Sequence, residues 1–223
     1  INIRLIIKTI KPSIVHLVAL RPIIMGLIGI ILINNIKVVS SITGMGSIFL
    51  SKNLKIRFLK YFIFVFLFIS FKRKKNNIIV QNKDDYNFFL KKFNINKNRI
   101  FLIRGSGVDT NYFNYVKEPS VNSIIVTFVG RLIKDKGIET LFEAFKKVKN
   151  KNIYLLIAGN IDTSNPSAIT EKYINSELKK NKNISWLGEV KNIKKLWEKS
   201  HIAILPSKRE GLPKSLLEAA ASG

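Results

Sequence analysis

The segment Ile202-Ala-Ile-Leu-Pro-Ser-Lys-Arg-Glu-Gly-Leu-Pro-Lys-Ser-Leu-Leu-Glu-Ala-Ala-Ala-Ser-Gly223 decides how this chain of 223 residues folds. Its first five residues, 202–206, are a short apolar run of the kind that forms a buried strand. Pro213 suits the start of a helix, because the first helical position needs no backbone N–H. The segment is therefore predicted to run from a strand through a tight loop into a helix.

Two glutamates, Glu210 and Glu218, stand on either side of the predicted helix start. Glu210 falls in the loop, and Glu218 lies about a turn and a half into the helix at ~3.6 residues per turn. Open parallel sheets bind ligands beyond the carboxyl ends of their strands, and a helix start offers free N–H groups to a phosphate. Both carboxylates can then face one ligand site. The alternative is an ordinary helix start, with one acidic residue before it and one exposed on it.

Apolar runs alternate with helical patterns through the rest of the chain, which predicts an α/β fold with two parallel-sheet layers. The predicted strands cover 11–19, 37–43, 77–81, 100–104, 123–129, 153–158 and 184–188, and the predicted helices include 23–33, 56–75, 168–179 and 193–199. A polar stretch interrupts the pattern and suggests a domain boundary. The expected division is a first domain at 1–117, a linker at 118–122 and a second domain at 123–223. Because the chain starts with Ile1 and stops within a helix-ending pattern, both domains are expected to be incomplete.

Four motifs resemble the large retaining glycosyltransferase family 4, whose members use nucleotide-sugar donors and have the GT-B fold. Glu210-Gly-Leu-Pro-Lys-Ser-Leu-Leu-Glu218-Ala is similar to the family signature, and Gly130-Arg-Leu-Ile-Lys-Asp-Lys-Gly137 to its donor-phosphate loop. The looser similarities are Gly105-Ser-Gly-Val-Asp-Thr-Asn-Tyr-Phe113 and Gly44-Met-Gly46. The resemblance implies two Rossmann-like domains that face an interdomain cleft.

On the donor side, the resemblance implies that Arg131 and Lys136 bind the diphosphate. Fixed cations there would stabilise the charge that gathers on the leaving group as the sugar bond breaks. Glu218 would hold the ribose hydroxyls, and Glu210 would lie at the donor sugar as the catalytic residue, orienting it and stabilising charge rather than forming a covalent bond. Gly130, Gly211 and Leu212 complete the expected donor-binding set. The alternative for the loop is a solvated basic turn.

On the acceptor side, Gly44 and Gly46 directly follow a predicted strand, where glycine allows close backbone approach to a ligand. They resemble the strand-end loop of family members that extend polyprenyl-diphosphate-linked sugars, although a simple turn would look the same. Many members carry a histidine after this strand. Here Thr43 and Gly44 take that place, so no histidine role is transferred.

The family resemblance implies a retaining, metal-independent transfer of a hexose or N-acetylhexosamine from a nucleotide-diphosphate sugar, with a UDP-sugar expected. The acceptor would be a polyprenyl-diphosphate-linked saccharide in bacterial cell-surface polysaccharide synthesis, lipopolysaccharide included. No cofactor beyond this co-substrate is expected, and the sequence contains no Asp-x-Asp pair for a metal. The alternatives are a nucleotide-sugar epimerase of similar fold and a non-catalytic protein that binds a membrane surface or nucleic acid.

The composition favours an anionic surface as a partner, because 38 Lys and Arg oppose 14 Asp and Glu, a formal net charge of +24. The segment 56–75 combines a basic helix with bulky apolar residues, which suits the interface of an anionic leaflet. Its apolar run, 61–71, is too short to span a bilayer, which takes ~20 residues. A peripheral position on the cytoplasmic face of the cell membrane is expected, and nucleic acid is not. The alternative is a core helix with a solvated basic end.

Overall fold

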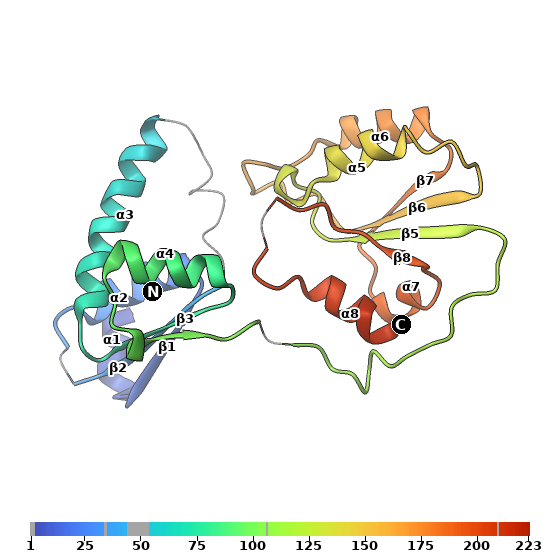
Figure 1. Ribbon diagram of the computed structural model, residues 1–223. Coiled ribbons are helices and arrows are strands. Elements are labelled where there is room, and N and C mark those ends of the chain that lie inside the picture. The colour runs from blue at the N-terminus through green and yellow to red at the C-terminus, as the bar shows by residue number, and fades with distance from the viewer. Residues whose placement is uncertain (1–2, 34, 44–53, 106, 209) are drawn as a thin grey trace. The chain divides into compact units, whose positions relative to one another are not determined.

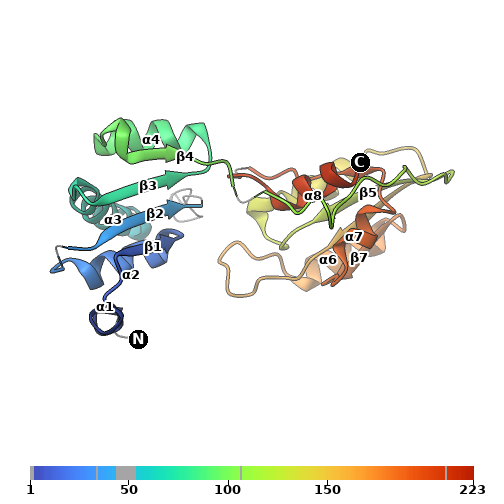
Figure 2. The ribbon, with the colours of Figure 1, turned by 90° about the horizontal axis from the view of Figure 1, so that it is seen from below.

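The computed structural model describes residues 3–33, 35–43, 54–105, 107–208 and 210–223. The chain divides into two compact units, Ile1–Gly105 and Ser106–Gly223. Each unit is built on a four-stranded parallel sheet with helices packed against it (Figures 1 and 2). The α/β class with two parallel-sheet layers, predicted from the alternation of strands and helices, is confirmed.

The first unit has the strand order β1-β2-β3-β4, so its strands follow one another across the sheet in chain order. Right-handed crossovers that all step in one direction place their helices on one face. The strands are β1 Ile14–Val18, β2 Lys37–Ile42, β3 Asn76–Val80 and β4 Ile100–Leu102. The helices are α1 Ile3–Ile10, α2 Leu20–Ile30, α3 Leu54–Lys72 and α4 Lys83–Phe93, followed by the short 3₁₀ helix η2 Lys97–Arg99.

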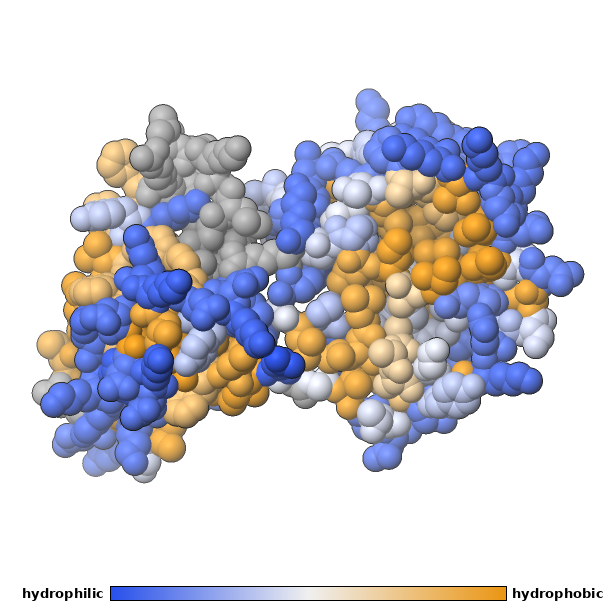
Figure 3. Space-filling model, in the orientation of Figure 1, coloured by the Kyte–Doolittle hydropathy of each residue, from blue (hydrophilic) through white to orange (hydrophobic). Residues whose placement is uncertain are grey.

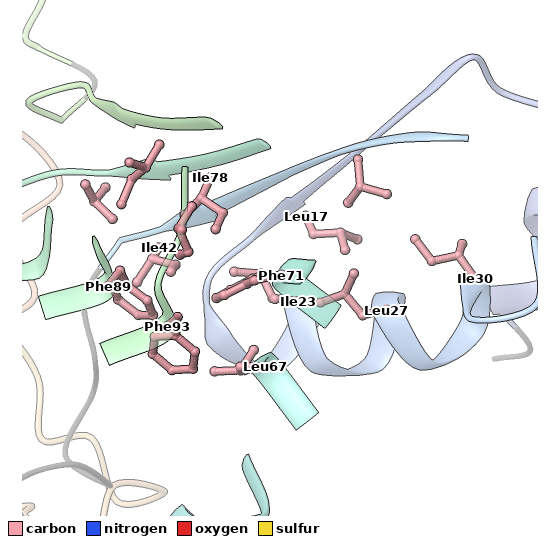
Figure 4. Close-up of a cluster of buried hydrophobic side chains, with 14 of the residues drawn as sticks. Leu17, Ile23, Leu27, Ile30, Ile42, Leu67, Phe71, Ile78, Phe89 and Phe93 are labelled. Carbon is pink, nitrogen blue, oxygen red and sulfur yellow. The ribbon is translucent and has the colours of Figure 1, made fainter. Parts of the chain in front are cut away.

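The core of the first unit lies between these helices and the sheet (Figure 4). The helices contribute pairs four residues apart, which lie on one face of a helix. The pairs are Ile23 and Leu27 from α2, Leu67 and Phe71 from α3, and Phe89 and Phe93 from α4, all at most 3% exposed. Burying each such side chain contributes about 1.5–3 kcal/mol. The aromatic content of α3 and α4 therefore first of all builds this core.

Two arginines of the first unit close helix ends rather than facing solvent. Arg73 donates from Nη1 to the carbonyl of Ile30, at 2.9 Å, and from Nη2 to the carbonyl of Ile33. Arg99 donates to the carbonyls of Phe71 and Arg73, each at 2.6 Å. The last carbonyls of a helix have no partner within it, so these side chains satisfy the ends of α2 and α3. Arg73 is therefore a structural member of the basic cluster 72–75.

The second unit has the strand order β7-β6-β5-β8. The chain moves from β5 outward through β6 to β7, and then returns to pair β8 with the other side of β5. Helices α5 and α6 cover one face of the sheet, and α7 and α8 the other (Figure 1). The strands are β5 Ile124–Val129, β6 Ile153–Ala158, β7 Ile184–Gly188 and β8 Ile202–Ala203. The helices are η3 Lys134–Lys136, α5 Ile138–Phe145, α6 Glu171–Lys180, α7 Ile193–Trp197 and α8 Lys214–Ser222.

This strand order creates a topological switch point between β5 and β8. Connections leave the two strands in opposite directions there, and open α/β sheets bind ligands in the crevice beyond the carboxyl ends at such a point. The loops that follow β5 and β8 contain the two motifs most similar to the glycosyltransferase signature. The fold therefore brings 130–137 and 204–213 to the same edge of one sheet.

The segment that follows Gly105 is hydrogen-bonded to the rest of the second unit at residues 114 and 116. The backbone N–H of Val116 donates to the carbonyl of Ser222 at 2.8 Å, and Nζ of Lys194 donates to Oδ1 of Asn114 at 2.7 Å. The division between the units falls after Gly105, whereas the sequence places a linker at 118–122. A polar segment without periodic apolar residues has the same sequence pattern whether it links two domains or lies on the surface of one. The sequence alone therefore does not fix the position of the boundary.

Two local features differ from the sequence-based expectation. Pro213 occupies the N-cap of α8 with an extended ψ of 110°, and the first helical residue is Lys214. Helix α1 was not predicted. Among the helices that the structure describes, none is long and apolar enough to cross a membrane.

Candidate functional site

The candidate site is formed by the loops that follow β5, β6 and β8. Because these strands are parallel, their carboxyl ends share one edge of the sheet. The loops cover residues 130–137, 159–170 and 204–213. Hydrogen bonds and close backbone contacts join all three, as the following pairs show.

Lys136 and Glu210 join the loop after β5 to the loop after β8. Nζ of Lys136 lies 2.5 Å from Oε1 of Glu210, and each side chain is 23% exposed. The position of Glu210 in the loop just before the helix is the predicted one. The structure thus places the predicted phosphate cation directly beside the predicted catalytic carboxylate, in a partly desolvated setting where charges interact more strongly than in water.

Gly137 allows these two loops to approach at the level of the backbone. It has a φ of 77°, and a Cβ at this position would lie 2.0 Å from the carbonyl oxygen of Pro206. The carbonyl of Asp135 accepts hydrogen bonds from the N–H of Lys208 and the hydroxyl of Ser207, each at 3.1 Å. A side chain at Gly137 would therefore force the loops apart.

Gly130 and Gly159 bring the ends of β5 and β6 together in the same way. The N–H of Gly130 donates to the carbonyl of Ala158 at 3.0 Å. A Cβ on Gly159, whose φ is 142°, would lie 1.9 Å from the carbonyl oxygen of Gly130. The indole N–H of Trp186 in β7 donates to the carbonyl of Gly159 at 2.9 Å. The predicted donor-side Gly130 is thus fixed between two strand ends.

Arg131 is held by an aspartate that sequence reasoning did not single out. Its Nη1 donates to Oδ2 of Asp162 at 2.7 Å, and the Arg131 side chain is 61% exposed. The Ser164 hydroxyl donates to Oδ1 of Asp162 at 2.6 Å. The hydrogen bond from Ser164, and after it the one from Arg131, lower the pKa of the Asp162 carboxyl below its ordinary value. The Asp162 carboxylate is therefore ionised where it contacts Arg131, the residue predicted to bind phosphate.

Glu218 lies on α8 and is buried, with 9% of its surface exposed. Nζ of Lys214, one turn earlier, lies 3.6 Å from its Oε1. Gly211 and Leu212 are half-buried in the turn that precedes the helix. The alternative interpretation, in which Glu218 is exposed on an ordinary helix, does not agree with this burial. Its role toward a nucleoside stays a prediction.

The predicted acceptor-side residues Gly44 and Gly46 lie outside the residues that the structure describes. A cavity of about 520 Å³ in the second unit lies between residues 116–119, α7, β8 and α8, and no predicted site residue lines it. Within the described ranges, His, Cys, Asp and Glu side chains form no group of three or more that could hold a metal ion.

Sequence reasoning also missed a polar pair at the ends of β6 and β7. Nδ2 of Asn160 donates to Oε2 of Glu189 at 2.9 Å. Each of them directly follows a glycine at a strand end, Gly159 just after β6 and Gly188 as the last residue of β7, as Arg131 follows Gly130 just after β5. Applying the strand-end criterion to every predicted strand would therefore have found Asn160 and Glu189, and would have drawn attention to Asp162 two residues further on.

Residues 114–223 match the family described as glycosyl transferases group 1. This part of the chain belongs to that family. The matched range includes every predicted donor-side residue, from Gly130 to Glu218. The resemblance found in the motifs is thereby confirmed, and the three loops lie within the group 1 region.

Two curated relatives extend the comparison. A Campylobacter jejuni protein named N,N'-diacetylbacillosaminyl-diphospho-undecaprenol alpha-1,3-N-acetylgalactosaminyltransferase is 26% identical over 199 residues, which are 82% of this chain and 49% of the relative. The capsular polysaccharide biosynthesis glycosyltransferase CapH of Staphylococcus aureus is 38% identical over 109 residues, covering 48% of this chain and 29% of CapH. The chain spans about half the length of the Campylobacter jejuni relative, at 49%.

Solved structures support the same fold across both units. HepE of Anabaena, crystallised in complex with UDP, matches with a TM-score of 0.77 at 14% identity, over 98% of this chain and 60% of HepE. Sucrose-phosphate synthase of Thermosynechococcus elongatus matches with a TM-score of 0.76 at 15% identity, over 97% and 55%. At this identity the likeness establishes the fold, which is the predicted GT-B type.

Proposed function

We propose that this protein is a retaining glycosyltransferase. It would move a hexose or N-acetylhexosamine from a nucleotide-diphosphate sugar to a polyprenyl-diphosphate-linked saccharide. The observation that carries the proposal is the contact between Lys136 and Glu210 at the switch point of a group 1 fold. The relative from Campylobacter jejuni, whose name includes a diphospho-undecaprenol, supports the acceptor class. HepE, crystallised with UDP, supports a UDP-sugar as donor. The pathway class we propose is bacterial cell-surface polysaccharide synthesis.

In this proposal, Arg131 and Lys136 bind the donor diphosphate. Breaking the bond to the sugar leaves the diphosphate with additional negative charge, so fixed cations stabilise the transition state more than the bound donor. Arg131 offers a planar fork to phosphate oxygens and Lys136 adds a point charge. These two side chains would supply the stabilisation that a divalent metal provides in other transferases, and we therefore propose a metal-independent reaction.

Glu210 is proposed to act at the donor sugar. Its Oε1 is paired with Lys136, and no described residue donates to its Oε2. As the bond to diphosphate breaks, positive charge develops at the anomeric carbon, and a fixed carboxylate nearby stabilises it. Pairing with Lys136 holds this carboxylate in a fixed orientation before the donor arrives. Glu218, buried on α8, is proposed to accept hydrogen bonds from the ribose diol.

The first unit is proposed to lie on an anionic membrane surface through α3. Large apolar side chains are exposed along this helix at intervals of three and four residues, which form one face. They are Phe58, Tyr61, Phe62, Val65, Phe68 and Ile69, each at least 40% exposed. Figure 3 shows hydrophobic residues at the surface of the first unit along this helix. Leu67 and Phe71, on the opposite face of α3, are buried. The same helix therefore packs one face against the core and exposes the other.

Charge supports this proposal. The first unit, 1–105, holds 19 of the 38 Lys and Arg but only two of the 14 Asp and Glu, Asp84 and Asp85 on α4. Lys72, Lys74 and Lys75, at the end of α3, are exposed. An apolar face bordered by cations binds an anionic leaflet without crossing it. We therefore propose a peripheral position at the inner face of the cell membrane, where a lipid-linked acceptor would be accessible.

Calorimetry with UDP and GDP tests the donor site. Arg131→Ala is expected to weaken binding by about 1.5–3 kcal/mol, the range for a hydrogen bond to a charged group. Lys136→Ala is expected to cost at least as much, because it also leaves Glu210 facing the diphosphate without its counter-ion. Lys134→Ala is the matched control, since this lysine lies in the same loop and pairs with Glu139 at 3.5 Å.

Unchanged affinity for both diphosphates in the Arg131 and Lys136 variants would remove these residues from the site. Conversion of the nucleotide sugar in the absence of any acceptor would instead indicate the epimerase alternative. A donor screen scored by the nucleoside diphosphate released, with a polyprenyl-diphosphate saccharide present, would identify the base and the sugar.

A further inference from the structure

The loop that follows β6 has no role in the reaction proposed above, yet it runs alongside the donor loop for most of its length. The N–H of Leu132 donates to the carbonyl of Asn160 at 3.0 Å, and the N–H of Ile169 donates to the carbonyl of Leu132 at 3.1 Å. The N–H of Lys134 donates to the carbonyl of Ser167 at 2.8 Å. These bonds fix the position of 160–169 relative to 131–134.

Asp162 is the residue of this loop that contacts a predicted donor ligand. Its own loop holds it in place, because Ser164 Oγ donates to Oδ1 at 2.6 Å and the N–H of Asn165 donates to its carbonyl at 2.9 Å. The Asp162 side chain is 20% exposed, whereas that of Arg131 is 61% exposed. The short, partly buried carboxylate is therefore the anchor, and the long exposed arginine is the group that it holds.

The contact leaves most of the guanidinium available. Arg131 has five N–H donors, and only Nη1 engages Asp162, at 2.7 Å. No other described residue accepts a hydrogen bond from the Arg131 side chain. Immobilising a free arginine side chain costs conformational entropy, a cost that a ligand avoids when the side chain is already held.

We propose that Asp162 is a positioning residue for the donor site, which holds one edge of the Arg131 guanidinium so that its remaining donors face the diphosphate. The proposal rests on the proposed function, in which Arg131 binds the donor diphosphate. The opposite effect is also physically conceivable, since a carboxylate beside Arg131 could compete with the diphosphate or repel it. The two effects differ in sign, so that a single substitution separates them.

The test is calorimetry with UDP on the unmodified protein, Asp162→Asn, Arg131→Ala and the double variant. Asp162→Asn keeps the size of the side chain and removes its charge. We expect it to weaken UDP binding about three- to tenfold when Arg131 is present, the scale of a modest coupling between contacting residues. In the Arg131→Ala background it should have no effect, because the group that it positions is gone. Asp162→Glu should restore part of the affinity.

Tighter UDP binding in Asp162→Asn would overturn the proposal in favour of competition. Equal weakening in both backgrounds would also overturn it, because Asp162 would then support only the shape of the loop. If Arg131→Ala leaves UDP affinity unchanged, the donor site itself is wrong. If Arg131→Ala weakens binding and Asp162→Asn does not, the donor site stands and the positioning role fails. Ser164→Ala should shift affinity in the same direction as Asp162→Asn, by a smaller factor.

Discussion

Nζ of Lys136 and Oε1 of Glu210 lie 2.5 Å apart, although 74 residues separate them in the chain. The contact joins the loops after β5 and β8 at the topological switch point of the sheet. It also couples the two charges that the proposed reaction uses, one for the leaving group and one for the sugar.

The two glutamates should affect different kinetic parameters. Glu210→Gln should chiefly lower kcat, by about 10²–10³, the effect of removing one preorganised electrostatic group. Glu218→Gln should chiefly raise the donor KM, because the nucleoside is bound alike in the ground state and the transition state. Steady-state kinetics with a donor sugar and a lipid-linked acceptor measure both. Glu171→Gln, at the exposed start of α6, is the control.

Equal effects on kcat and KM in both variants would contradict this division of roles. Near-native turnover in Glu210→Gln would remove Glu210 from catalysis altogether. Because Lys136 loses its counter-ion in Glu210→Gln, the same variant should bind UDP at least as tightly as the unmodified protein, which calorimetry can check.

Gly137→Ala should destabilise the protein more than Gly107→Ala does. The two glycines have nearly the same φ, 77° and 74°, so each alanine carries a left-handed strain of about 1–2 kcal/mol. At Gly107 a Cβ would meet nothing within 4 Å, whereas at Gly137 it would collide with the carbonyl of Pro206. We expect an additional 1–3 kcal/mol at Gly137, roughly the cost of overpacking. Urea unfolding of the two variants gives this difference, and equal destabilisation would mean that the loops separate freely.

Glu177 should make the stability of the protein depend on acid pH. It is 4% exposed, and its carboxylate oxygens lie 2.7 Å from Nζ of Lys180 and 3.0 Å from Nζ of Lys146. The hydrogen bond from Lys180, supported by that from Lys146, lowers the pKa of Glu177 although burial opposes the shift. A lowered pKa gives stability that is present above the ordinary glutamate pKa of about 4.3 and is lost as the pH falls through the folded-state value.

The measurement is urea unfolding between neutral and acid pH for the unmodified protein and Glu177→Gln. The variant should be less stable at neutral pH, and the difference should shrink as the pH falls. Glu143→Gln removes a 63%-exposed partner of Lys146 and should change the curve much less. A difference that stays constant with pH would show that Glu177 contributes packing rather than charge.

Neutralising the exposed lysines at the end of α3 should weaken binding to anionic vesicles. Each charge near the surface is worth about 1 kcal/mol, and added salt should mimic the substitution. The variant replaces Lys72, Lys74 and Lys75 by Gln. Arg73 is left in place, because it donates to the carbonyls of Ile30 and Ile33 and its loss would disturb the fold.

The matched control changes the same number of exposed charges in the second unit. It replaces Lys147, Lys149 and Lys151 by Gln. A second variant, Tyr61→Ser with Phe62→Ser, removes exposed apolar area from α3 and should also weaken binding. Vesicle binding that is absent, or that both lysine variants reduce equally, would leave α3 as a core helix with a solvated basic end.

The sequence predicts best those parts of the fold and the site that are formed by residues close together in the chain. The runs 153–158 and 184–188 are predicted and observed as β6 and β7, because their alternation with polar turns leaves no other assignment. Glu210 was placed correctly because a strand, a loop and a helix follow one another locally. Asp162 was missed because its partner, Arg131, is 31 residues away. That contact depends on β6 lying beside β5, and no local pattern encodes the strand order β7-β6-β5-β8.

The approach of Gly137 to Pro206 has a consequence for biosynthesis. Residues 130–137 leave the ribosome well before residues 204–210 are made, so the donor loop cannot close while the chain is still short of β8. Contacts between distant parts of a chain form late, because the intervening loop must be ordered first. The nascent second unit should therefore expose an unpaired edge of β5 until β8 is added. At that stage the donor site would not yet be formed and could not bind nucleotide, while the unpaired edge of β5 would be accessible to chaperones.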